Sequence, residues 1–181
     1  MNILVYTDSS LSFVRGIRLT GAGVTICRGK DTAFEKAVAL GWHVEVFDAE
    51  MEGLAMAAEA VKDLVANADA DHPIRSIHFF ADNMGALQRI HKGTPGKAQA
   101  CSQRFRAVVF PILHSHPNIE MTLAWVPGHL EVAGNEHSDN LVKENSGEQP
   151  ESPQYHSAAF SGCMRKHDLR THWTTAWTTD P

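Results

Sequence analysis

Four carboxylate residues that lie far apart in this 181-residue sequence could form one metal site: Asp8, Glu50, Asp82 and Asp139. Asp8 and Asp82 each follow an apolar run typical of a buried strand, and sites in open α/β sheets form beyond the carboxyl ends of strands. Ligands that are all oxygen suit a hard cation such as Mg²⁺ or Mn²⁺, and clustered carboxylates repel one another without one. We therefore expect a divalent-cation site if the two strands are neighbours.

The helix expected from Ala49 to Ala66 directs Glu50 inward. At about 100° per residue, Glu50 lies in the middle of the apolar stripe of this segment. Because a buried carboxylate is costly without a partner, the position favours a metal ligand. Glu52 and Glu59 fall on the opposite side of the helix, where we expect both to be solvated.

Apolar runs and turn-forming residues predict the remaining elements. Five strands are expected, at Ile3–Tyr6, Gly23–Cys27, Trp42–Phe47, Ser76–Ala81 and Glu120–Trp125. Further helices are expected at about 83–91, 97–114 and 133–143. The turn-forming residues Thr7–Ser10 should end the first strand. Asp82 or Asn83 should cap the helix that follows the strand at Ser76–Ala81. A meander of three strands followed by alternating helices and strands indicates an α/β domain with a mixed sheet.

Residues 146–181 differ in composition from the rest of the chain. Ser146–Gln154 combines Pro, Ser, Gly and Glu, as linkers do. Beyond it, apolar residues recur at loosely helical spacing: Phe160, Met164, Leu169, Trp173 and Trp177. We predict one folded domain at 1–145 and a linker with a helical tail at 146–181, which either docks on the body or contacts a neighbouring domain.

Composition excludes two classes of protein. With 43% apolar and 20% charged residues the chain resembles ordinary globular proteins, and no apolar run approaches the roughly 18 residues of a membrane span. Three widely spaced cysteines exclude a disulfide scaffold. Without a secretory signal at the N-terminus, we expect an intracellular protein, in either cytoplasm or nucleus.

The charge is distributed unevenly. A net charge of −5 argues against coating nucleic acid by bulk electrostatics. Yet residues 83–119 contain no Asp or Glu and carry five cations: Arg89, Lys92, Lys97, Arg104 and Arg106. Such a segment fits either a phosphate-bearing partner or a solvated helix face.

Four short blocks resemble, in order, the signature blocks of type 1 ribonuclease H. They are Tyr6–Ser10, Ala49–Met51, Ala81–Leu87 and Trp125–Asp139. The last block, Trp-Val-Pro-Gly-His followed by Gly-Asn-Glu-x-x-Asp, is the most specific. It looks like the ribonuclease H domain that follows the reverse transcriptase of non-LTR retrotransposons, and the likeness covers about residues 1–145.

The resemblance implies a ribonuclease H-like α/β fold, with a five-stranded mixed sheet in the order 3-2-1-4-5 flanked by helices. It also implies hydrolysis of the RNA strand of RNA–DNA hybrids, leaving 3′-hydroxyl and 5′-phosphate ends. Asp8, Glu50, Asp82 and Asp139 would hold two Mg²⁺ ions, with Mn²⁺ as an alternative, and His129 matches a histidine that assists proton movement or product release. Two ions about 4 Å apart can activate a water and stabilise the leaving oxygen.

The partners implied are an RNA–DNA hybrid and a neighbouring reverse transcriptase domain in a parent polyprotein, with no membrane. We predict nucleic-acid contacts at six residues: Ser10, Asn83, Lys92, Lys97, Arg104 and Asn135. The alternative is a non-catalytic module that only grips nucleic acid or supports a polymerase. Such a module has no need of clustered acids.

The sequence departs from the family pattern at Ser9, where the family usually has glycine. A glycine-only conformation there would cost about 1 kcal/mol or more. The segment between Asp82 and Trp125 is also too short for the basic protrusion of some bacterial members. Cys163, His167 and His172 are loosely spaced like zinc ligands, but they lack a fourth.

Overall fold

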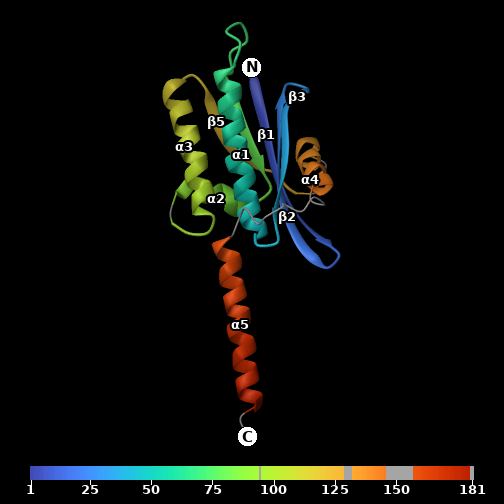
Figure 1. Cartoon of the computed structure of the whole chain (residues 1–181). Helices are drawn as coiled ribbons and strands as arrows, with labels where there is room; N and C mark the ends of the chain where they lie inside the picture. Colours follow the sequence, from blue (N-terminus) through green and yellow to red (C-terminus); the bar gives the residue numbers. More distant parts are fainter. Residues whose placement is uncertain (94, 129–131, 146–156, 180–181) are drawn as a thin grey trace.

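A computed structural model describes residues 1–93, 95–128, 132–145 and 157–179 (Figure 1). The described residues form five strands: β1 (Asn2–Val14), β2 (Ile17–Arg28), β3 (Asp31–Gly41), β4 (Ser76–Ala81) and β5 (Glu120–Trp125). They also form five helices: α1 (Val46–Ala66), α2 (Met84–Lys92), α3 (Gln99–Ser115), α4 (Ala133–Asn145) and α5 (Ala158–Thr179).

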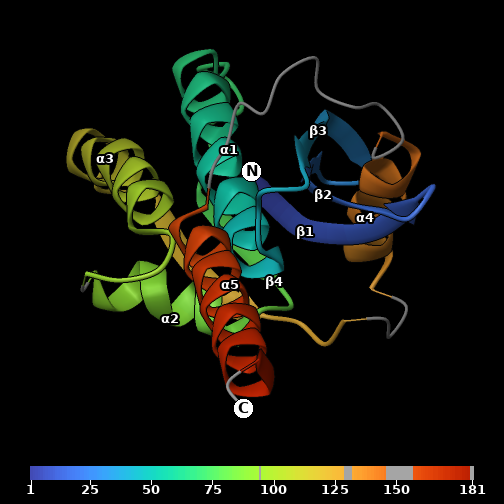
Figure 2. The ribbon, with the colours of Figure 1, turned by 60° about the horizontal axis from the view of Figure 1, so that its bottom comes forward.

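The strands form one mixed sheet in the order β3-β2-β1-β4-β5, as the resemblance implies. β1 pairs antiparallel with β2 and parallel with β4, and β5 extends the sheet parallel to β4. Figure 2 shows α1 and α3 on one side of the sheet and α4 on the other. The fold is therefore a three-layered α/β arrangement in which β1 is the central strand.

The core lies between α1 and the sheet. Val5, Val24 and Phe79 from three strands meet Leu54 and Val61 of α1, and none of the five is more than 2% exposed. Burying each such side chain contributes about 1.5–3 kcal/mol. This packing sets the height of α1 on the sheet, and with it the position of the helix's first turns.

Three strand predictions are wrong in their bounds. The second strand, predicted at Gly23–Cys27, runs from Ile17 to Arg28. β1 continues through Thr7–Ser10 to Val14, because β2 supplies a backbone partner for each residue of this segment. The predicted third strand, Trp42–Phe47, is instead the connection into α1, which begins at Val46. The third strand lies earlier, at 31–41, where charged residues suit a sheet edge and β2 provides the template.

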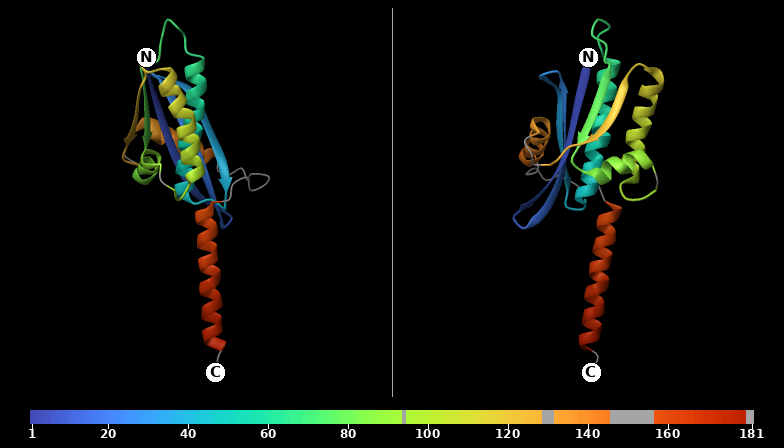
Figure 3. Two further views of the ribbon diagram at one scale, coloured as in Figure 1. Left: turned by 90° about the vertical axis from the view of Figure 1, so that its left-hand side faces the viewer. Right: turned by 180° about the vertical axis from the view of Figure 1, so that it is seen from behind.

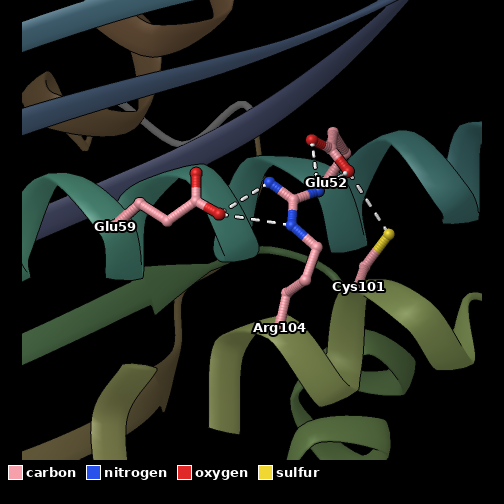
Figure 4. A network of polar contacts seen from close by, with 4 residues as sticks. All are labelled: Glu52, Glu59, Cys101 and Arg104. Carbon is pink, nitrogen blue, oxygen red and sulfur yellow. Dashed lines mark hydrogen bonds and ion pairs between the residues drawn. The ribbon is translucent and has the colours of Figure 1, made fainter. Parts of the chain in front are cut away.

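The prediction that Glu52 is solvated is also wrong. Only 3% of this residue is exposed, and both of its carboxylate oxygens accept hydrogen bonds from Arg104 Nη1 at 2.8 Å. Cys101 Sγ lies 3.4 Å from the same carboxylate, and Arg104 also binds the exposed Glu59 at 2.9 Å (Figure 4). Arg104 therefore joins α3 to α1, a contact that helical periodicity on α1 alone does not reveal.

We expect Arg104→Met to lower the free energy of unfolding by about 3 kcal/mol, because it leaves the buried Glu52 carboxylate without its counter-charge. Urea unfolding at pH 7 measures the loss. Glu59→Gln is the matched control and should cost less than about 1 kcal/mol, since Glu59 is half exposed. Equal losses in the two variants would contradict this account of Glu52.

The tail is helical from Ala158 to Thr179, as its spacing predicts. Ser157 anchors its start: its hydroxyl donates to Asp48 of α1, and its N–H donates to the His43 carbonyl at 3.1 Å. The Phe160 ring lies edge-on to His43, while the rest of α5 extends away from the sheet at the end where α1 begins (Figure 3). The side chain of His172 lies outside the described residues.

A bilayer span needs a helix that is both long and strongly apolar. Within the described ranges, no helix meets both conditions.

Candidate metal centre

The parallel pairing of β1 with β4 brings the first two acids together. The last residues paired are Thr7 and Ala81, so Asp8 and Asp82 are the next residues on adjacent strands. β4 ends there, but β1 continues alongside β2, so Asp8 does not end its strand as expected. The two carboxylates nevertheless lie at the same level of the sheet.

Glu50 reaches the same point from the second turn of α1. One ligand oxygen from each of Asp8, Glu50 and Asp82 lies within 4.8 Å of the others, and we call these three residues the acidic trio. Among the described side chains, the trio is the group of potential ligands close enough to share one ion. Three acids separated by about 40 and 30 residues thus meet in space, although their predicted role as metal ligands stays a prediction.

Burial and mutual repulsion raise the pKa values of two members of the trio, Asp8 and Glu50. Glu50 is 4% exposed, and burial, followed by the charges of Asp8 and Asp82, raises its pKa to about 8, although the hydrogen bond from Ser9 lowers it. Burial, followed by the charge of Asp82, raises the pKa of Asp8 to about 7. A bound divalent cation would offset both effects.

The donor atoms fit a hard cation. Among the described residues, Glu50 Oε2 and Asn135 Oδ1 are buried without a hydrogen-bond partner. A buried oxygen that lacks a partner costs about 1–3 kcal/mol, so such atoms call for a ligand or a water. Carboxylate and amide oxygens are the ligands that Mg²⁺ and Mn²⁺ accept.

Asp139 approaches from the opposite face of the sheet. It lies on α4, is 5% exposed, and its charge contributes to the raised pKa of Asp8. It is not within the 4.8 Å group, and its Oδ2 accepts a hydrogen bond from Lys143 one turn later. Sequence reasoning missed Lys143, although its i,i+4 spacing from Asp139 is the signal of a helical ion pair.

Close packing of α4 on β2 places Asp139 and Asn135. A Cβ on Gly23 would lie 2.9 Å from the Ser138 carbonyl oxygen, so only glycine fits there. Ser138 Oγ donates to Thr25 Oγ1 at 2.9 Å, and Asn135 Nδ2 donates to Asp8 Oδ2 at 3.0 Å. α4 is therefore fixed to the sheet at the level of the trio.

Ser9 does not incur the backbone strain considered above. Among non-glycine residues described, only Arg15 and Ala98 have a left-handed φ, so Ser9 occupies ordinary strand conformation. Its N–H donates to Asp8 Oδ1 at 2.7 Å and its hydroxyl donates to Glu50 Oε1 at 2.6 Å. The serine thus contacts two members of the trio.

The loop after β5 comes close to Asp82. Trp125 Nε1 donates to the Asp82 carbonyl at 2.8 Å, and a Cβ on Gly128 would collide with the Asp82 carboxylate. His129, the next residue, lies outside the described residues.

The six predicted nucleic-acid contacts occupy different surroundings. Ser10 is buried on β1, and Asn83 caps α2 by accepting from the Ala86 N–H at 3.1 Å. Lys92 and Lys97 are exposed on either side of the connection from α2 to α3. Arg104 is occupied by Glu52 and Glu59, and Asn135 by Asp8. Of the six, the two lysines present their charge most openly to solvent.

A cavity of about 750 Å³ lies elsewhere, between α1, α3 and the first turns of α5. Its lining includes Val44, Ala98 and Cys101, and none of the trio. The buried oxygens without a hydrogen-bond partner, Glu50 Oε2 and Asn135 Oδ1 among the described residues, point to chemistry at the trio instead.

No protein-family model matches the chain, and no curated protein matches it. Several solved structures are similar to the chain. LC11-RNase H1, isolated from compost and solved in complex with an RNA/DNA hybrid, is 20% identical, with a TM-score of 0.57 over 80% of this chain and 96% of its own. RNase H1 from the halophilic archaeon Halobacterium salinarum NRC-1 is 19% identical, with a TM-score of 0.53 over 80% of this chain and 97% of its own.

The protease–reverse transcriptase of Prototype Foamy Virus is also similar, at 15% identity and a TM-score of 0.58. The match covers 82% of this chain but 21% of the viral one. With the strand order β3-β2-β1-β4-β5, these matches define a ribonuclease H-like fold. Its structural neighbours include ribonuclease H1 enzymes and a longer reverse transcriptase chain.

Proposed function

We propose that this protein is a ribonuclease H, an endonuclease that hydrolyses the RNA strand of RNA–DNA hybrids with the help of divalent cations. One observation carries the proposal: Asp8, Glu50 and Asp82 converge from β1, α1 and β4, with a buried Glu50 oxygen that lacks a partner. A fold whose neighbours include a ribonuclease H1 solved with an RNA/DNA hybrid supports the choice of substrate.

Within this proposal, the trio and Asp139 hold two Mg²⁺ ions, with Mn²⁺ as a substitute. When bound there, the ions would supply activation of a water and stabilisation of the oxygen that leaves phosphorus, and the expected products carry 3′-hydroxyl and 5′-phosphate ends. The side chains supply the negative charge and the geometry: Asn135 and Ser9 fix the Asp8 carboxylate by hydrogen bonds to its two oxygens. His129 would assist proton movement or product release, since histidine exchanges protons near neutral pH.

We further propose that residues 1–145 are the catalytic domain and that the chain derives from a non-LTR retrotransposon polyprotein, beside a reverse transcriptase domain. The signature block from Trp125 to Asp139 supports this origin, and the match to a longer viral reverse transcriptase chain supports the neighbouring reverse transcriptase domain. The same match supports the alternative, a non-catalytic module that assists a polymerase.

Incubation of the full chain with a labelled RNA–DNA hybrid, with Mg²⁺ or with EDTA, tests the proposal. We expect the RNA strand to be cut in Mg²⁺ only, with single-stranded RNA left intact. Hybrid binding without any cleavage in Mg²⁺ or Mn²⁺ would favour the non-catalytic module.

Lys92 and Lys97 should contribute to hybrid binding through phosphates. We expect Lys92→Gln with Lys97→Gln to weaken binding several-fold and to make the negative slope of log K against log salt shallower by about 2, one for each phosphate that a lysine no longer neutralises. Fluorescence anisotropy between about 50 and 200 mM salt measures both quantities.

The matched control is Lys62→Gln, an exposed lysine in the second half of α1. It should leave affinity and slope unchanged. If the double variant also keeps the wild-type slope, both lysines belong to a solvated helix face.

A further inference from the structure

Ser9 joins two carboxylates that reach the site from different elements. Its N–H donates to Asp8 on its own strand, and its hydroxyl donates to Glu50 Oε1 on α1 at 2.6 Å. Ser9 is itself half-buried in β1 and pairs with Ala22 of β2, so its backbone is held in the sheet. The hydroxyl therefore starts from a fixed point.

This contact distinguishes the two oxygens of Glu50. Oε1 is occupied by the Ser9 hydroxyl, whereas Oε2 is buried and, among the described residues, has no hydrogen-bond partner. A glutamate side chain has three rotatable bonds, and a flexible ligand loses conformational freedom when it binds an ion. Holding one oxygen in place leaves the other preorganised for the ion.

We propose that Ser9 is a positioning residue, whose hydroxyl fixes the Glu50 carboxylate in the orientation that binds the divalent cation. This inference rests on the ion-dependent function proposed above. Glycine at this position would offer no hydroxyl, so the site of this chain carries its own support for the ligand from α1. Such supporting hydrogen bonds change metal affinity by about 10- to 100-fold when they are removed.

Calorimetric titration of the full chain with Mn²⁺ and with Mg²⁺, without nucleic acid, tests the proposal. We expect Ser9→Ala and Ser9→Gly to raise the dissociation constant about tenfold. Ser9→Thr keeps the hydroxyl on a residue that suits a strand, and it should stay within about twofold of the wild type. Ser12→Ala, three residues along β1, is the matched control and should bind as the wild type does.

A double-mutant cycle separates positioning from general damage. In the Glu50→Gln background, Ser9→Ala should cause no further loss of ion affinity, because the contact it removes no longer orients a carboxylate. Urea unfolding in EDTA checks that each variant folds, and the Gly, Ala and Thr variants provide independent routes if one does not.

The outcomes separate the role of Ser9 from the function of the site. Wild-type ion affinity in Ser9→Ala and Ser9→Gly, with the wild-type chain binding ions and cutting hybrid, would overturn the role of Ser9 alone. A wild-type chain that binds no ion would overturn both this inference and the proposed function.

Discussion

Asp8→Asn should abolish cleavage of an RNA–DNA hybrid in Mg²⁺, with a loss of at least about a thousandfold. Asp8 follows the last residue of β1 that pairs with β4, as Asp82 follows the last residue of β4, and Asn135 orients the Asp8 carboxylate. Metal ions supply several kcal/mol of transition-state stabilisation, and about 1.4 kcal/mol corresponds to a tenfold change in rate. Asp82→Asn should have an effect of the same size. Initial rates on a labelled hybrid measure both.

The matched control is Asp63→Asn, an exposed acid near the end of α1 that should leave the rate unchanged. Circular dichroism and urea unfolding establish that the variants are folded. Asn is nearly isosteric with Asp and removes charge repulsion from the trio, so Asp8→Asn should be at least as stable as the wild type in EDTA. Undiminished cutting by both Asp8→Asn and Asp82→Asn would refute the assignment of the site.

In the absence of divalent ions, we expect the free energy of unfolding to fall as pH rises from about 4 to about 8. The pKa of Asp8 is raised to about 7 and that of Glu50 to about 8, so the folded state keeps protons that the unfolded state has already lost. Stability decreases with pH wherever the unfolded state binds fewer protons. The loss amounts to several kcal/mol, since both pKa values lie well above their ordinary ones and each pKa unit corresponds to about 1.4 kcal/mol.

Divalent ions should remove this dependence. Because Mg²⁺ binds deprotonated carboxylates, it should stabilise the protein more at pH 8 than at pH 5. Urea unfolding at four pH values, in EDTA and in Mg²⁺, measures the effect, and Glu50→Gln should flatten the slope in EDTA. The lowered pKa of Glu45, caused by its hydrogen bonds with Arg18, affects stability only below about pH 5, so it acts at the acid end of this window, where it makes stability rise with pH. Stability that is flat or rising across the window would show that the trio is not a repulsive cluster.

Some structural features could be predicted from local sequence because they depend on neighbours along the chain. β5 begins and ends at the predicted residues, and Asn83 caps α2 as its side-chain chemistry indicates. The inward direction of Glu50 also follows from helical periodicity, which places Glu50 on the same side of α1 as the buried Leu54 and Val61.

Other features depended on partners far away in the chain. β3 carries residues with weak strand preference, and β2 induces it by pairing, so local propensity misplaced it. Glu52 is buried by α3 through Arg104, which lies more than 50 residues later. Neither partner is visible in the segment that it acts on.

The sequence by itself determined the types and the order of the catalytic candidates, since residue chemistry and hydrophobic period are local properties. It also carried the family likeness that implied the strand order. Only the tertiary structure decided that Asp8 sits within a continuing strand, that Lys143 already neutralises Asp139, and that the Ser9 hydroxyl holds one oxygen of Glu50. Those facts depend on distances of a few ångströms between separate elements, and such distances are fixed by packing of the whole chain.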